Sequence, residues 1–377
     1  MLRNGRKQDA VRQNPIFTYI LATLMRTHQL TFTRFVAAFA IVVFHFGQNV
    51  SPFSQLNFLF SQANLGVSFF YLLSGFVMMI AYKKKQTISS TEYFQNRFAR
   101  VYPLYVLALL VCFFIFSANN KTALGLGLLG LQAWSPRYAL DLNVPGWSIS
   151  VEAFFYLTFP FLFNNFYRRQ SFKTVCIGIG IVWVLSQVAF HLLINSKSYQ
   201  PYPSNEYAFA HYFPLLHLNE FLVGNLLGLL YCRLTKGKNY DIHLVVLAFS
   251  ILALLKLNLP VNYHNGLLAI LFGPFIYLLA LNTGKITSVF SKKPMVYLGE
   301  ISYGVYILQF PVYIFCQRLF NTKNSDGWFY SYVGILLGAS VICYHVVENP
   351  LRELLKARHK KVVKPSNSRA VQMSVTE

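Results

Sequence analysis

Charged residues, and acidic residues above all, are scarce in this sequence. Asp, Glu, Lys and Arg make up 12% of the 377 residues, whereas a soluble domain carries about 25%. In their place, 55% of the residues are hydrophobic and 17% are aromatic. The apolar residues form blocks of about 20, the length that an α-helix needs to cross the hydrocarbon of a bilayer. The composition therefore excludes an ordinary soluble domain and indicates a polytopic helical membrane protein.

Several motifs that would define a soluble enzyme are also missing. The sequence has no P-loop and no dinucleotide fingerprint. No Gly-x-Ser-x-Gly elbow surrounds Ser74, so we interpret this serine, among small residues, as part of a helix-packing surface. The 5 cysteines have neither the spacing of a disulfide framework nor that of a metal site. We accordingly predict no bound metal.

The placement of the positive charges predicts a topology. Apolar spans can be delimited at 32–48, 63–81, 101–118, 149–166, 174–194, 213–231, 243–259, 266–282, 302–320 and 329–347. With the N-terminus in the cytosol, 27 of the 33 Lys and Arg residues fall in or beside cytosolic segments, as the positive-inside rule requires. The net charge of +21 thus indicates orientation in a membrane rather than nucleic-acid binding. We predict an all-α protein of about ten transmembrane helices, with segment 1–31 and a basic tail at 351–377 both cytosolic.

Two ionisable residues, Arg34 and His45, lie inside the first span, where such residues are costly. They are eleven residues apart, close to three helical turns, so both project from one face and His45 lies about 16 Å deeper. A lone histidine in such a span is commonly a packing residue. Because Arg34 shares its face, we interpret the pair as functional, since imidazole can accept a proton from a hydroxyl near neutral pH.

Two further arginines, Arg97 and Arg100, stand three apart at the predicted cytosolic start of the third span. They could be ordinary positive-inside anchors, which is our interpretation of Lys83–Lys85. Paired guanidinium groups facing a cavity could instead bind phosphates bidentately.

The sequence GWSISVE near the outer end of the fourth span supplies three more candidates. Ser148 and Glu152 are four apart and share a helix face. Glu152 could bind sugar hydroxyls or orient the histidine, or it could merely cap the helix. Trp147 could stack on a sugar ring or be an interfacial aromatic. Glu220 is a weaker candidate, buried if the sixth span is correct.

In their order, these motifs resemble the acyltransferase family 3 membrane proteins over roughly residues 30–350. The shared elements are Arg34-x10-His45, the run from Gly66 to Phe76, Arg97-x-x-Arg100 before Tyr102 and Pro103, Trp147-Ser148-x3-Glu152, the run from Leu298 to Tyr306, and Glu348-x-Pro350. In one departure, Gln309 stands where many members have His. In another, there is no room after residue 350 for the hydrolase-like domain that some members carry.

The resemblance implies an acyltransferase domain at 32–350 in the bacterial cytoplasmic membrane. It implies acyl-CoA, usually acetyl-CoA, as a cytosolic donor, and a hydroxyl of a glycan or lipid-linked saccharide as the acceptor. His45, Arg34 and Glu152 would be catalytic, with His45 a general base or an acyl carrier. Arg97 and Arg100 would bind the donor, and Ser148 and Trp147 the acceptor.

Two other classes of function are compatible with intramembrane charges. One is a transporter or flippase for a lipid-linked sugar or an acyl donor, which would often show internal repeats; we find no convincing duplication. The other is a binding or assembly component without activity, against which the intact motifs argue. The sequence fixes neither the size of the acyl group nor the oligomeric state.

Overall fold

The computed structural model describes residues 28–354 except 116–119, 234–236, 258 and 321–325. Most of the predicted segments 1–31 and 351–377 therefore lies outside the described residues. The long helices are α3 (His28–Phe46), α5 (Gly66–Tyr82), α6 (Ser90–Ile115), α8 (Gly146–Phe161), α9 (Phe172–Ile194), α11 (Leu218–Arg233), α12 (Asp241–Leu257), α13 (Ala269–Leu281), α15 (Lys293–Phe320) and α16 (Asp326–Cys343).

Shorter helices connect the long ones. They are α4 (Asn57–Phe60), α7 (Lys121–Leu128), α10 (Asn205–Tyr212) and α14 (Lys285–Phe290), with π-helical extensions η5 (Leu162–Tyr167) after α8 and η7 (Tyr344–Glu348) after α16. Single 3₁₀ turns are η1 (Phe53–Leu56), η2 (Ala63–Leu65), η3 (Gln132–Trp134), η4 (Pro136–Tyr138) and η6 (Pro214–His217). Within the described part of the chain, β pairing is confined to one bridge between Lys238 and Asn282. The predicted all-α class is confirmed.

Seven described helical segments are long and apolar enough to cross a membrane. They are His28–Phe46, Ala63–Tyr82, Ser90–Ile115, Gly146–Tyr167, Phe172–Ile194, Asn205–Arg233 and Asp326–Leu354, and each overlaps a predicted span. Helices α12, α13 and α15 do not meet this criterion of length and apolar composition. They coincide with the remaining predicted spans, 243–259, 266–282 and 302–320. A multi-pass membrane protein is thus supported, whereas the predicted count of ten and the orientation of the termini are not confirmed.

Helix α9 shows why the fold suits a membrane. Its exposed side includes Ile177, Ile181, Leu185 and Leu192, with 52%, 53%, 61% and 69% of each residue exposed. The spacings of four, four and seven residues place them on one helical stripe. An apolar stripe of this length matches hydrocarbon rather than water. The Ser171 hydroxyl starts the helix by accepting a hydrogen bond from the Thr174 backbone N–H at 3.1 Å.

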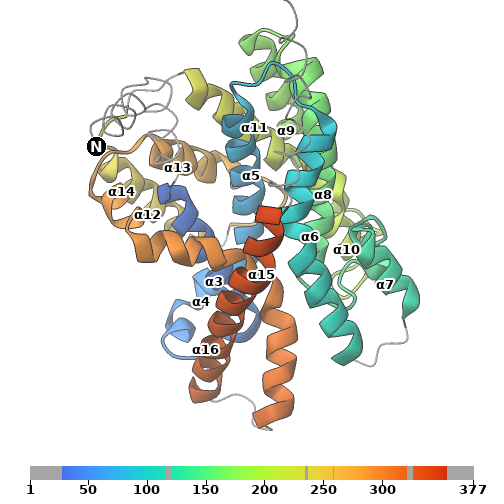
Figure 1. The fold of residues 1–377 in the computed structure, drawn as a ribbon. Helices are drawn as coiled ribbons and strands as arrows, with labels where there is room; N and C mark the ends of the chain where they lie inside the picture. Colours follow the sequence, from blue (N-terminus) through green and yellow to red (C-terminus); the bar gives the residue numbers. More distant parts are fainter. Residues whose placement is uncertain (1–27, 116–119, 234–236, 258, 321–325, 355–377) are drawn as a thin grey trace, which may run out of the picture.

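Helices α5 and α11 touch backbone to backbone. A Cβ added to Gly75 would lie 2.2 Å from the Phe221 carbonyl oxygen, and one added to Gly224 would lie 2.1 Å from that of Leu72. Glycine is thus the residue that permits this approach, as at close helix crossings in membranes. In Figure 1, α5 runs through the middle of the molecule, with α12, α13 and α14 on one side and α6 and α8 on the other.

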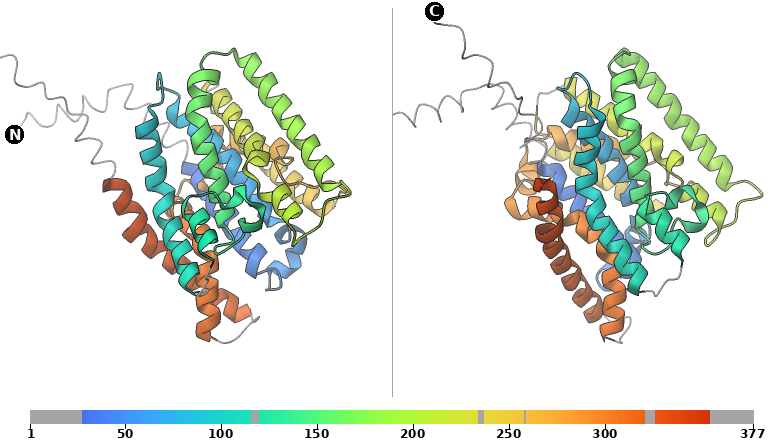
Figure 2. Two further views of the ribbon diagram at one scale, coloured as in Figure 1. Left: turned by 90° about the vertical axis from the view of Figure 1, so that its right-hand side faces the viewer. Right: turned by 45° about the vertical axis from the view of Figure 1, so that its right-hand side comes forward.

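Helices α3 and α15 pack side by side and run in the same direction. At one end, a Cβ on Gly299 would lie 2.0 Å from the Thr31 carbonyl oxygen. Toward the other end, the Phe310 ring lies 5.3 Å from the His45 ring. Helices α15 and α16 extend together beyond the other helices, as both views of Figure 2 show. The helix that carries Arg34 and His45 is therefore lined by α15 over most of its length.

Candidate active site

A cavity of about 480 Å³ lies between α3, α5, α6, α8, α15 and the end of α16. It gathers five of the seven residues that the sequence predicted for the site: Arg34, Arg97, Arg100, Ser148 and Glu152. The other two, His45 and Trp147, are not among its lining residues. The fold therefore brings the predicted donor-binding and acceptor-binding residues into one space.

The Glu152 carboxylate is held by two hydroxyl groups. Tyr156, one turn further along α8, donates to Glu152 Oε1 at 2.5 Å, and Ser74 Oγ of α5 donates to the same oxygen at 3.4 Å. Ser74, interpreted from the sequence as a packing residue, thus faces the cavity, while its neighbour Gly75 makes the close helix contact. Glu152 is oriented by neutral donors within reach of the cavity, so its charge remains available to a ligand.

Three tyrosine rings surround Arg97. Its guanidinium carbon lies 5.8 Å from the centroids of Tyr82 and Tyr156 and 5.7 Å from that of Tyr93. Cation–π attraction of this kind positions a guanidinium without neutralising it. Arg97 consequently presents its positive charge to the cavity beside the ring of Tyr156, the same tyrosine that holds Glu152.

Ser148 is buried and fully engaged. Its hydroxyl donates to the Pro145 carbonyl oxygen at 2.8 Å and accepts from the Tyr306 hydroxyl at 2.8 Å. The Tyr71 hydroxyl donates to the Ser148 carbonyl oxygen at 3.4 Å. A hydroxyl whose proton is already used by the backbone suits a positioning role better than a nucleophilic one.

Three further ionisable residues, Glu300, Glu348 and Arg352, line the same cavity. The Tyr344 hydroxyl donates to Glu300 Oε2 at 2.9 Å, and Arg352 donates to Asn349 Oδ1 at 2.9 Å. Glu348 had been noted as part of a family motif without a role, whereas Glu300 and Arg352 were missed. The helix continues to residue 354, so Arg352, assigned to the tail, belongs to the cavity wall. The four-residue spacing of Glu348 and Arg352, which places both on one helix face, was the feature of the sequence that could have identified Arg352 as a site residue.

Charged side chains line the cavity, and some of their buried polar atoms are unpaired. Among the described residues, Arg97 Nε, Glu348 Oε1 and Arg352 Nε are buried and make no hydrogen bond. Such groups are nearly always hydrogen-bonded in proteins. The lining contains four arginines and three glutamates. Unpaired donors and an excess of positive charge fit a polar, anionic ligand.

His45 lies beyond one end of this cavity. Its ring contacts aromatic rings, those of Phe44 at 4.9 Å, Phe46 at 5.7 Å and Phe310 at 5.3 Å. Phe310 follows the cavity residue Tyr306 by four positions on α15, which is about one turn or 6 Å. His45 is half-buried, in an apolar setting one turn past the cavity.

Gln309, which stands where the related family often has His, is a structural residue here. It is fully buried. Its side-chain amide donates to the Tyr306 carbonyl oxygen at 2.7 Å, and its backbone carbonyl oxygen accepts from the Tyr332 hydroxyl of α16 at 3.1 Å.

No group of three or more His, Cys, Asp or Glu residues within the described ranges could hold a metal ion.

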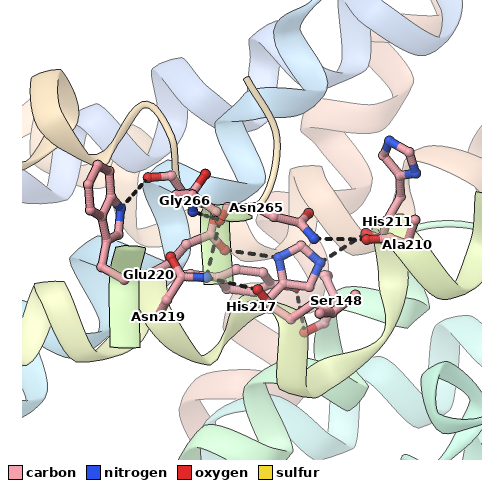
Figure 3. A network of polar contacts seen from close by, with 12 residues as sticks. Ser148, Ala210, His211, His217, Asn219, Glu220, Asn265 and Gly266 are labelled. Carbon is pink, nitrogen blue, oxygen red and sulfur yellow. Dashed lines mark hydrogen bonds and ion pairs between the residues drawn. The ribbon is translucent and has the colours of Figure 1, made fainter. Parts of the chain in front are cut away.

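Trp147 does not line the cavity and instead contacts a buried polar network, which Figure 3 shows. Its ring lies 5.4 Å from that of His217. His217 Nδ1 lies 2.9 Å from Glu220 Oε2 and its Nε2 lies 2.9 Å from the His211 carbonyl oxygen. The two side chains of this pair are 4% and 0% exposed. Glu220, the weaker sequence candidate, is therefore buried as expected and anchors the segment behind Trp147.

The network continues into the loop before α13, which Figure 3 also shows. Asn265 donates to the Ala210 carbonyl oxygen at 2.8 Å, and Asn219 donates to the Asn265 carbonyl oxygen at 3.1 Å. Burial, with the His211 and His217 rings nearby, lowers the pKa of His264 in this loop to about 3. The loop histidine is therefore neutral at physiological pH.

Comparisons with known proteins give a consistent result. The profile of a family described as "Acyltransferase domain" matches residues 27–347. Acyltransferase MdmB of Streptomyces mycarofaciens is 26% identical over 380 aligned positions, which cover 91% of this chain and 96% of that protein. O-acetyltransferase OatA of Staphylococcus aureus is 22% identical over 328 positions, which cover 77% of this chain and 52% of OatA. This chain thus matches about half the length of OatA. No solved structure matches it significantly.

Proposed function

The chain belongs to acyltransferase family 3, and on this premise we propose that it is a membrane O-acyltransferase that uses acyl-CoA. The acyl group is proposed to be acetyl and to come from the cytosol. The acceptor is proposed to be a hydroxyl of a cell-surface or lipid-linked saccharide. The protein would then act in the bacterial cytoplasmic membrane, among its lipids.

One observation carries this proposal: a single cavity of about 480 Å³ contains Arg34, Arg97, Arg100, Ser148 and Glu152. They come from three helices, α3, α6 and α8, of an apolar protein, in which each ionisable side chain is costly unless it has a function. Cations suited to phosphates therefore lie beside a carboxylate and a hydroxyl suited to a sugar. A donor and an acceptor could both be held there.

The donor end is assigned to Arg97 and Arg100. The diphosphate of CoA carries negative charge on planar groups of oxygens, which guanidinium groups bind in fork geometry. Arg97 is positioned by tyrosine rings rather than by a carboxylate, so its charge is free for a phosphate. Arg34 lines the same cavity and would contact the donor further along.

His45 is proposed as the general base. It would accept the proton of the acceptor hydroxyl, whose oxygen attacks the thioester carbonyl carbon. The carbon–sulfur bond then breaks, and the CoA thiolate takes the proton from the His45 imidazolium, which returns the base to its neutral form. Ser148 and Glu152 would position the acceptor. In the alternative route the imidazole itself attacks, carries the acyl group, and transfers it to the hydroxyl in a second step.

Labelled acetyl-CoA added to membranes that contain the protein tests the reaction. We expect label in saccharide with the wild type and none with His45→Ala. The control is His243→Ala, which replaces an exposed histidine of α12 and should retain transfer. Retained labelling by His45→Ala would overturn the role of His45. Label found on the protein after denaturation would favour the carrier route.

The arginine pair is tested by binding, which needs no acceptor. We expect Arg97→Ala combined with Arg100→Ala to weaken CoA binding at least tenfold, since hydrogen bonds to charged groups contribute about 1.5–3 kcal/mol each. Unchanged affinity, measured by titration calorimetry, would show that the phosphates bind elsewhere.

A further inference from the structure

A second, smaller pocket opens beside the end of α5. It has a volume of about 320 Å³ and is lined by four cations, Lys83, Lys84, Lys85 and Arg168. The described residues that line it include no acid. From the sequence, these lysines were interpreted as ordinary membrane anchors, which would not require a pocket among them.

The floor of this pocket is apolar and partly aromatic. Met79, Phe163 and Tyr167 line it and are only 1%, 5% and 8% exposed, whereas all four cations are exposed. The aromatic rings of Phe163 and Tyr167 below a rim of positive charge suit a planar aromatic base that carries a phosphate, because bases stack on aromatic side chains.

Tyr82 lies between a cation of this pocket and a cation of the main cavity. Lys85 Nζ and the Arg97 guanidinium carbon each lie 5.8 Å from the centroid of its ring. The two cations, one from each site, are therefore no further apart than twice that distance. Adjacent residues of α5 also divide between the sites, since Met78 lines the main cavity and Met79 lines the pocket. One elongated ligand could occupy both.

We propose that this pocket binds the adenine and the 3′-phosphate of the CoA donor while its diphosphate lies at Arg97 and Arg100. This inference rests on the proposed function and specifies which part of the donor is recognised. A phosphate monoester carries a charge of about −1.5 to −2 at neutral pH, and lysine ammonium groups bind it as point charges. The pocket would thereby select CoA over thioesters that lack the nucleotide.

An anionic lipid headgroup is the competing ligand, because basic pockets between helices also bind headgroups. The apolar floor of the pocket and the position of Tyr82 between the two sites favour the nucleotide. A headgroup would need the rim alone, and its binding would not depend on the donor.

The test compares CoA with dephospho-CoA, which lacks only the 3′-phosphate. Full-length protein in phosphatidylcholine nanodiscs is titrated with each compound. The wild type should bind CoA about tenfold more tightly. The variant Lys84→Ala with Arg168→Ala should bind both compounds equally. Lys83 and Lys85 are left intact in every variant, so that their contacts with the Cys232 carbonyl oxygen and with Glu92 are kept. Lys173→Ala, at an exposed lysine of α9, should keep the tenfold ratio.

Phosphatidylglycerol binding is measured in parallel for each protein. Three results would overturn the inference: equal binding of both compounds by the wild type, an unchanged ratio in the double variant, or a double variant that alters only the binding of phosphatidylglycerol. The last of these would assign the pocket to a lipid. If neither CoA nor dephospho-CoA binds at all, the proposed donor itself is wrong, which is a distinct failure. Circular dichroism and unfolding temperature confirm that each variant is folded.

Discussion

Gly224 of α11 is a position at which adding a single methyl group should be harmful. Its Cβ would lie 2.1 Å from the Leu72 carbonyl oxygen and 3.1 Å from the Gly75 Cα. A carbon and a carbonyl oxygen in contact are normally about 3.3 Å apart or more. Gly224→Ala therefore requires α5 and α11 to move apart by about 1 Å at this point. Both opposing atoms belong to the backbone, so no side-chain rotation can relieve the clash.

Two opposing effects decide how far Gly224→Ala lowers the free energy of unfolding. Alanine is favoured over glycine inside a helix by about 1 kcal/mol. Overpacking typically costs about 1–3 kcal/mol, and occasionally more. Because the clash is with backbone, we expect a cost at the upper end and a net loss of about 2 kcal/mol in the free energy of unfolding. Gly180 of α9 is the matched control, since its Cβ would meet nothing within 4 Å; Gly180→Ala should be neutral or stabilising.

A thiol-reactive fluorophore can report this unfolding. Cys112 and Cys316 are buried free cysteines, so they react when the helices separate on heating. Gly224→Ala should react at a lower temperature than the wild type, and Gly180→Ala should not. Acyl transfer should fall as well, because α5 also carries Ser74, which contacts Glu152. Equal unfolding temperatures for the two variants would refute the close helix contact.

Two further substitutions separate roles within the site. Tyr156→Phe removes the hydrogen bond to Glu152 but keeps the ring beside Arg97. We expect acyl transfer to slow at least tenfold, because a hydrogen bond to a charged group contributes about 1.5–3 kcal/mol. The affinity for CoA should stay within twofold of the wild type. An equal loss of CoA affinity would contradict separate roles. His217→Phe leaves the buried Glu220 carboxylate without its partner and should cost about 3–5 kcal/mol of stability. In the same thiol assay, a loss below about 1 kcal/mol would show that the pair is unimportant.

Helical periodicity in the sequence was enough to predict which candidates share a face. Ser148 and Glu152, four apart, do face one cavity, and so do Arg97 and Arg100, three apart. The same geometry explains why Trp147 does not. The cavity is lined by Ser148, Ile149, Glu152 and Tyr156 of α8. At about 100° per residue, Trp147 falls on the opposite face of the helix from the centre of this set.

Contacts between distant segments could not be predicted from this pattern. Glu300 meets Tyr344 across 44 residues, and Arg352 reaches the cavity because the last helix continues past the predicted boundary. Neither fact follows from local apolar periodicity. The spacing of Arg34 and His45 can be read from the sequence. The position at which the cavity ends cannot, because it depends on side chains contributed by α15.

The end of the cavity near Tyr306 determines how the donor must reach His45. Tyr306 lines the cavity and bonds Ser148, while Phe310, one turn further, contacts His45. A thioester anchored by its phosphates at Arg97 must therefore extend past Tyr306, as the long pantetheine arm of CoA allows.

A larger ring at position 306 should block this route. We expect Tyr306→Trp to reduce transfer from labelled acetyl-CoA at least tenfold at saturating donor, with CoA affinity preserved because the phosphates bind at the other end. Tyr306→Phe, which loses only the hydrogen bond to Ser148, should retain more activity, since such a bond contributes about 1 kcal/mol. If Tyr306→Trp transfers acetyl groups at the wild-type rate, the thioester does not pass Tyr306, and the acceptor must instead be acylated within the cavity, with Glu152 rather than His45 as the nearest base.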